Sequence, residues 1–458
     1  MAPENDVLLI SIDSLRADHI SAMGYERETT PFLDGLIKQG MTFERAFSTA
    51  GFTLGSVTSF LTSTYPLEYG GYGPLSPDRP SLPEAYQRTG RQTIGIHENG
   101  WLTSEYNFDR GFDEYIDLYH SSSISDRIRR LISDRLPHSS HTFRTLKWVD
   151  DKLKPESGGE SGKTQLNRPP DRDATAVQQA QTAINREKST FVWVHLMGPH
   201  TPYYPPDDYH GLFSDTRIAP EEMASLHDKL VTKSGSLKEQ EVQTLVDLYD
   251  EEIHRLDTNL QKLIQGIDLD STTVAIISDH GELFGEYNDT FTHGPEMLEE
   301  LLHVPLLFLG NGVEPDQIST EVSLINLAPS LLAVSDNEED LVEKFRGKVL
   351  GKEQSTEPVC ACSAHRGTHV ADLDPSCRRL RVRAFPWKLV RRGIGAEVTD
   401  TWYDLRGDSD TVTTSTGPAE LAEKMDAFEQ RLDIKSDHGS NQISDELNSR
   451  LKELGYLK

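Results

Sequence analysis

Short apolar runs alternate with segments of helical periodicity along the chain as far as about residue 335. Residues Val274–Ile277 are four consecutive apolar residues, which is typical of a strand buried on both faces of a sheet. The pattern predicts strands over residues 6–12, 41–48, 92–97, 190–196, 272–278 and 304–309. It predicts helices near residues 31–39, 54–63, 124–136, 174–187, 218–230, 240–266, 295–302 and 322–334. This alternation indicates an α/β fold with a large, mostly parallel or mixed central sheet and helices on both faces.

The pattern changes after about residue 345, where short β segments separated by turns predict a small antiparallel sheet. These segments are residues 358–364, 380–385, 388–392 and 401–405, followed by helices near 418–432 and 441–454. We therefore expect a large domain over residues 1–345 and a small C-terminal antiparallel β subdomain with helices over 346–458. Residues 154–172 are rich in Pro, Gly and Ser, which predicts a flexible insertion.

Two of the predicted strands end in groups that bind metal ions. The run 272–278 leads into Asp279-His280-Gly281, and the run 6–12 leads into Asp13. In open α/β sheets, ligands bind at the carboxyl ends of the strands, where side chains distant in sequence meet. Carboxylates with one imidazole suit a divalent cation, and a glycine permits a tight turn. The alternative is that each acid caps a following helix.

The order and spacing of several blocks resemble the sulfatases of the alkaline phosphatase superfamily. The matching blocks are Ile12–Asp18, Thr53–Val57 before Leu61–Pro66, His195–Tyr203, Ser278–Glu282 and His303–Leu307. The resemblance covers residues 5 to 335 and implies a sulfatase-like catalytic domain there. It also implies a nucleophile at Thr53 and one divalent cation, Mn²⁺, Mg²⁺ or Ca²⁺, bound by Asp13, Asp279, His280 and the Thr53 oxygen.

The nucleophile position departs from the pattern of most sulfatases, in which a Cys or Ser is oxidised to formylglycine. Thr53 is followed by Gly55 and Val57, so the modification signature is absent, and oxidation of Thr would give a ketone. A lysine expected near residues 94–101 is missing. A single acid, a Thr and an Asp-His pair are similar to the lipoteichoic acid synthase branch, where unmodified Thr attacks phosphorus. The alternative for Thr53 is a helix N-cap.

Histidines in two further loops are candidates for proton transfer. His200 follows the predicted strand 190–196, and His293 lies shortly after the Asp-His pair. Imidazoles can protonate a leaving group near neutral pH. The resemblance favours His200 over His195, which we expect to be structural. Arg16 is expected to contact substrate or to fix the site in place.

Composition limits the class of protein. The formal net charge is −28 with the two signs interspersed, and arginine outnumbers lysine, which predicts a halophilic source. Such a charge argues against a nucleic-acid partner. No apolar run is long enough to span a membrane, and the start of the chain lacks a signal-peptide pattern, so we expect a cytoplasmic protein.

These observations predict a metal-dependent hydrolase or transferase that cleaves a phosphate ester through Thr53. Its substrate would be a small or glycan-linked anionic ester. One alternative is a sulfatase that cleaves sulfate esters of sugars or aryl alcohols without formylglycine. The other is a relative that binds a metal or glycan without turnover.

Overall fold

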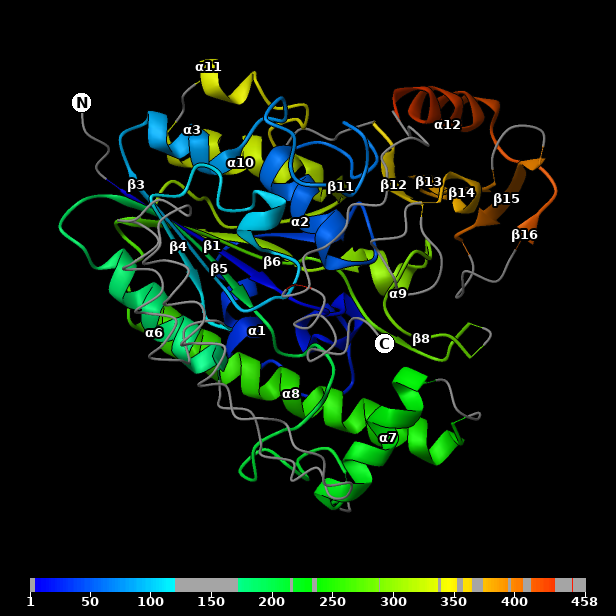
Figure 1. The fold of residues 1–458 in the computed structure, drawn as a ribbon, viewed down its shortest axis with the longest axis horizontal. Coiled ribbons are helices and arrows are strands. Elements are labelled where there is room, and N and C mark those ends of the chain that lie inside the picture. The colour runs from blue at the N-terminus through cyan, green and yellow to red at the C-terminus, as the bar shows by residue number, and fades with distance from the viewer. Residues whose placement is uncertain are drawn as a thin grey trace, which may run out of the picture.

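The computed structural model (Figure 1) describes eleven parts of the chain, and the structural statements below refer to these parts. They are residues 5–119, 172–214, 217–232, 237–287, 289–336, 339–351, 357–364, 374–393, 397–406, 413–432 and 447. The expected helices near 124–136 and 441–454 and the insertion at 154–172 lie outside these parts, apart from single residues.

A nine-stranded mixed sheet forms the centre of the molecule, as the sequence predicts. Its strands run in the order β11-β2-β10-β6-β1-β5-β3-β4, and the short β9 pairs with β2. Their bounds are β1 Asp6–Ile12, β2 Met41–Phe47, β3 Gln92–His97, β4 Glu114–Asp117, β5 Thr190–Leu196, β6 Thr272–Ser278, β9 His303–Val304, β10 Leu306–Gly310 and β11 Asp316–Ser323. The pairings of β10 and β9 are antiparallel and all others are parallel.

The side chains of β1 alternate between two hydrophobic cores, because successive residues of a strand point to opposite faces of the sheet. Val7 and Leu9 belong to one core and Leu8 and Ile10 to the other. The helices α2 Thr53–Thr62, α3 Leu82–Arg88 and α10 Leu327–Ser335 supply the first core. The helices α1 Pro31–Ile37, α6 Arg172–Ile184, α7 Pro220–Thr232 and α8 Glu239–Gln265 supply the second. Figure 1 shows these two groups of helices on opposite faces of the sheet.

Three expectations about elements are wrong in detail. The expected helix over 322–334 is the end of β11, a 3₁₀ turn and then α10, which begins at Leu327. The expected strand over 304–309 is divided at Pro305 into β9 and β10. The helix expected over 295–302 is only its last turn, α9 Glu299–Leu302.

A second, five-stranded antiparallel sheet follows in the C-terminal part, as predicted. It consists of β12 Val359–Ser363, β13 Arg379–Ala384, β14 Trp387–Arg392, β15 Thr399–Asp404 and β16 Thr413–Thr414, with α12 Ala419–Arg431 packed on it. Leu380, Val382 and Phe428 share one core with Phe52 and Val57 of the larger part. The division at residue 345 remains a prediction. Among the described helices, none combines the length and apolar character that crossing a lipid bilayer requires.

Candidate active site

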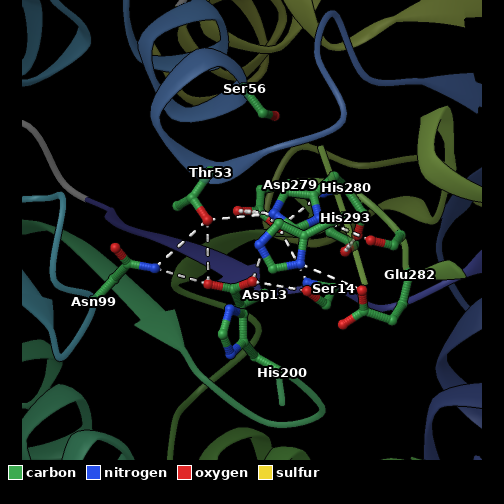
Figure 2. Close-up of polar contacts among 12 residues, drawn as sticks. Asp13, Ser14, Thr53, Ser56, Asn99, His200, Asp279, His280, Glu282 and His293 are labelled. Atoms are coloured by element: carbon green, nitrogen blue, oxygen red, sulfur yellow. Dashed lines mark hydrogen bonds and ion pairs between the residues drawn. The ribbon is translucent and has the colours of Figure 1, made fainter. Parts of the chain in front are cut away.

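Asp13 and Asp279 lie side by side because β1 and β6 are parallel neighbours in register. Ile12 pairs with Ser278, so the next residue of each strand leaves the sheet at the same edge. The Asp279 N–H donates to the Ile12 carbonyl at 3.0 Å, and the Asp13 N–H donates to the Leu196 carbonyl at 2.9 Å. Both acids are completely buried. The sheet topology thus places two carboxylates at one point, as the sequence predicts (Figure 2).

Thr53 lies above these carboxylates as the first residue of α2. Its Oγ1 is 3.2 Å from His280 Nε2 and 3.4 Å from Asp13 Oδ2. The N-cap residue is Phe52, so Thr53 does not cap the helix. The alternative role of Asp279 as a cap is also excluded, because β7, Leu283–Phe284, is the next element and no helix follows directly.

The turn after Asp279 depends on Gly281 for a reason that the sequence did not show. A Cβ at residue 281 would stand 1.9 Å from the carbonyl oxygen of Glu300, closer than any real contact. The Gly281 N–H donates to the Leu301 carbonyl at 2.9 Å. The glycine therefore permits a close backbone approach that holds His280 in place.

The donor atoms at this point fit a cation. His280 Nδ1 donates to the Gly281 carbonyl at 2.8 Å, so the neutral ring presents the lone pair of Nε2 to the site. This Nε2 lies 3.6 Å from both Asp13 Oδ1 and Asp279 Oδ2. Asp279 Oδ2 is buried without a hydrogen-bond partner among the described residues. Lone pairs that face one another without an intervening proton repel unless a positive charge lies between them.

Proton affinities at the site follow from this crowding. Burial, and then the neighbouring Asp13 carboxylate, raise the pKa of Asp279. Burial alone would raise the pKa of Asp13, but the imidazoles around it, His200 first, lower it. Burial, together with His293, lowers the pKa of His280 to about 3, so this ring is neutral. Two adjacent buried carboxylates both ionise only if a countercharge joins them.

His195 also contacts Asp13, although we expected it to be structural. Its Nε2 is 3.2 Å from Asp13 Oδ2, and Asp13, His195 and Asp279 together offer three atoms that lie within 4.8 Å of one another. The Ser11 hydroxyl accepts from Trp193 Nε1 at 2.9 Å and lies 2.9 Å from His195 Nδ1. If Ser11 donates its proton to Nδ1, Nε2 carries the proton of the neutral ring and donates to Asp13. His195 then orients Asp13, as groups behind a ligand do.

Asn99 is a site residue that the sequence analysis missed. It follows β3, and its Nδ2 donates to Asp13 Oδ2 at 2.9 Å and to Thr53 Oγ1 at 3.5 Å. The side chain is completely buried. The only available signal was its place just beyond the carboxyl end of a predicted strand, in the segment where a lysine was expected.

The predicted histidines both reach the site. The ring of His293 lies 4.6 Å from that of His280 and 5.0 Å from that of His200, between centroids. Burial acts to lower the pKa of His293, but the Glu282 carboxylate, 3.3 Å from Nδ1, outweighs it and the pKa is raised. Burial lowers the pKa of His200. Figure 2 shows His200 below Asp13 and His293 between His280 and Glu282.

Arg16 fixes the loop after β1 in place. Its guanidinium is buried and pairs with Asp18 at 2.6 Å and with Glu286 at 2.5 Å. It also donates to the Glu282 carbonyl at 3.1 Å. Arg16 was expected either to contact substrate or to fix the site in place. These contacts support the second role, because they join the loop after β1 to the segment after His280.

Similarity to known proteins covers only part of the chain among the curated relatives. The chain is 27% identical over 209 residues to arylsulfatase K of Xenopus laevis, a match covering 42% of this chain and 37% of that protein. It is 30% identical over 152 residues to the low-salt glycan biosynthesis sulfotransferase Agl7 of Haloferax volcanii, covering 32% of this chain and 33% of that protein. The chain thus spans only about a third of the length of these two curated relatives.

The fold has close counterparts among solved structures. The phosphonate monoester hydrolase of Agrobacterium radiobacter superposes with a TM-score of 0.63 at 19% identity, covering 93% of this chain and 94% of that one. The sulfatase family model matches residues 5–336, which span the central sheet from β1 to α10 and include Thr53 and the Asp-His pair. By this match over most of its length, the chain belongs to the sulfatase family.

Proposed function

We propose that this protein is a metal-dependent ester hydrolase or transferase that attacks the phosphorus of a phosphate ester with the hydroxyl of Thr53. The observation that carries the proposal is the position of Thr53 Oγ1. It lies at the N-terminus of a ten-residue helix, within 3.4 Å of both His280 and Asp13. A helix N-terminus favours the negative charge that develops on an attacking oxygen and on the phosphate.

Asp13, Asp279 and His280 would hold one divalent cation, with the Thr53 oxygen as a further ligand. When bound, such a cation lowers the pKa of a hydroxyl and offsets negative charge on the transferred group. One imidazole among the oxygen ligands favours Mn²⁺ or Zn²⁺ over Ca²⁺.

The other side chains supply positioning and proton transfer. The Thr53 hydroxyl loses its proton to solvent, and Thr53 Oγ1 forms a bond to phosphorus as the bond from phosphorus to the alcohol breaks. The protonated imidazole of His200 or His293 gives its proton to the departing alcohol. Asn99 donates to Thr53 Oγ1 and orients its lone pairs. Water, or an acceptor alcohol, then gives its proton to the imidazole and attacks the phosphorus, and the released Thr53 oxygen takes up a proton from solvent.

Phosphorus is favoured over sulfur by the chemistry of Thr. A formylglycine hydrate expels sulfate by returning to the aldehyde, and Thr has no such exit. A phosphorylated Thr is released by attack at phosphorus, which a cation assists. The names of the relatives include both a phosphonate monoester hydrolase and an arylsulfatase, so these names favour neither phosphorus nor sulfur. The similarity to a glycan biosynthesis sulfotransferase supports a glycan-linked ester as one form of the substrate.

Thr53→Ala tests the proposal. We expect the variant to lose turnover of an aryl phosphodiester by a factor of about 10³ or more, since the nucleophile is removed. The wild-type protein, incubated with the diester and quenched, should show a phosphate adduct on the peptide that contains Thr53 by mass spectrometry. Chelation should abolish activity, and Mn²⁺ should restore it.

Ser56→Ala is the matched control. Ser56 lies in the same first part of α2, and its hydroxyl accepts from Ser48 Oγ at 2.9 Å, away from Asp13 (Figure 2). This variant should keep its activity and take up phosphate on Thr53. Turnover of aryl sulfate alone, with no adduct, would establish the sulfatase alternative. A wild-type protein that binds Mn²⁺ and turns over neither ester would be the non-catalytic relative.

A further inference from the structure

The loop that carries His200 is hydrogen-bonded at its start to one carboxylate. Asp173, in the first turn of α6, accepts the N–H of Met197 at 2.8 Å and the N–H of Gly198 at 2.9 Å. This residue is only 4% exposed. Bonds from two consecutive amides to the two oxygens of one carboxylate fix both the place and the direction of the backbone at that point.

The far end of the same loop is held by a second carboxylate. Glu252 on α8 accepts the N–H of Tyr204 at 2.9 Å. Arg255, one turn further along α8, donates through Nε to Glu252 Oε2 at 2.7 Å and through Nη2 to Asp173 Oδ2 at 3.4 Å. The chain Asp173–Arg255–Glu252 therefore links α6 to α8, which pack together beneath the sheet in Figure 1.

Gly198 gives independent support for the tightness of this arrangement. A Cβ at residue 198 would stand 2.8 Å from Asp173 Oδ2 and 2.9 Å from Arg255 Nη2. The carboxylate and the guanidinium lie directly against the backbone, so any side chain at 198 would displace them. His200 is two residues further on, and its Nδ1 donates to the Thr201 carbonyl within the same loop.

We propose that Asp173, Arg255 and Glu252 form a clamp that positions His200 for proton transfer to the leaving group. The proposal rests on the proposed function of the site. The contacts described above join the clamp to the two ends of the His200 loop, so its members act through His200 and are positioning residues. Misplacement of a reacting group by about 1 Å can cost about a hundredfold in rate. Holding both ends of a short loop prevents such a shift.

The first test measures kcat and KM for an aryl phosphodiester in Asp173→Asn and Arg255→Lys. The first change keeps one acceptor oxygen and removes the charge, and the second leaves one ammonium, which cannot bridge two carboxylates through separate nitrogens. We expect kcat to fall about 10- to 100-fold with KM changed less than about threefold. Asp208→Asn is the matched control, because Asp208 is exposed further along the same segment, and its kcat should equal that of the wild type.

Combining Asp173→Asn with His200→Ala distinguishes a role in positioning His200 from a general loss of structure. If the clamp acts through His200, Asp173→Asn should lower kcat little further once His200 is absent, because the two residues serve one step. An equal additional loss in that background would overturn the proposal.

Two measurements without catalysis complete the design. Deuterium exchange of the peptide spanning residues 197–204 should quicken in Asp173→Ala and not in Asp208→Asn. The ring signal of His200, followed by NMR in histidine-labelled protein, should shift in Asp173→Asn. If the wild type turned over no ester, the proposed function would fail, and these two measurements would still decide on the clamp. Unchanged exchange and an unchanged ring signal would overturn it.

Discussion

Three of the polar groups around the Thr53 hydroxyl differ in what they exchange with it. His280 Nε2 and the Asp13 carboxylate can only accept a proton from the hydroxyl, whereas Asn99 Nδ2 can only donate to it. A hydroxyl has one proton, so it gives that proton to one acceptor and receives from Asn99. If Thr53 is the nucleophile, as we propose, Asn99 helps to orient the oxygen that attacks.

Replacement of Asn99 by Ala should lower kcat about 10- to 100-fold, somewhat less than the loss found when one oxyanion donor is removed. The affinity for Mn²⁺ should also fall, by about 10-fold, because Asn99 donates to Asp13 Oδ2 and so helps to orient a proposed ligand. Steady-state kinetics and calorimetric titration with Mn²⁺ would measure the two effects. Asn185→Ala, which removes an exposed amide after α6, serves as the control. Equal rates in both variants would show that Asn99 has no part in turnover.

The sequence could predict the side chains that follow β1 and β6, because each follows a continuous apolar run. It could not place Asn99, since β3 is separated from β1 by β5 in the sheet and strand order is not visible in a single sequence. For the same reason the contact of His195 with Asp13 was missed. The roles of Thr53, His200 and His293 remain predictions that the proposed variants test.

At the scale of elements, strands buried on both faces were predictable from their apolar runs, whereas the polar edge strand β11 was not. Every residue of β5 and β6 is buried, and each strand contains one apolar run in the sequence. Strand β11, DQISTEVS, is mostly polar and half-exposed, so neither its composition nor its period marked it as part of a central sheet. Such a strand at the edge of the sheet is recognisable only from its pairing with β2.

Helix α7 contacts the loop that carries His200 through His227, and this contact depends on pH. The Nε2 of His227 accepts the N–H of Tyr203 at 2.9 Å, which requires that this nitrogen carry no proton. Burial lowers the pKa of His227 to about 4, below its ordinary value of 6.5. Between about pH 4 and pH 6.5, His227 therefore carries a proton in the unfolded chain and none in the folded protein. The stability from this residue is present above pH 6.5 and is lost as the pH falls toward 4.

We expect the free energy of unfolding to fall by about 1–2 kcal/mol between pH 7 and pH 5 on account of His227. Denaturant unfolding at the two pH values would measure this change in the wild type and in His227→Gln, whose amide oxygen can accept the same N–H. The variant should lose less stability over this range. An identical pH dependence in both proteins would show that His227 titrates normally.

At the scale of the whole molecule, the C-terminal sheet and the central sheet are joined by charge as well as by their common core. Arg381, Arg383 and Lys388 gather around Glu299 of α9 at 2.6, 2.8 and 3.5 Å. Arg383 also pairs with Glu321 of β11 at 2.8 Å. These buried cations lie between two parts of a chain whose net charge is −28.

This excess of negative charge should make stability depend on salt. Like charges repel across the folded surface, and salt shortens the range of that repulsion from about 30 Å at 0.01 M to about 3 Å at 1 M. We expect the Tm, measured by calorimetry, to rise as KCl is increased from low to molar concentration. Sucrose at matched water activity, which screens no charge, should raise it less. A Tm that is flat in KCl would contradict the expected halophilic source.

The hydroxyl that we propose as nucleophile belongs to helix α2, whereas Asp13 and the Asp279-His280 pair follow the ends of two strands, β1 and β6. An exchange of the side chain at the start of α2 therefore need not disturb the strands below it. A Thr53→Ser or Thr53→Cys protein should retain the cation pocket while presenting a different attacking atom. The same fold could thus support a different reaction after substitution of the first residue of α2.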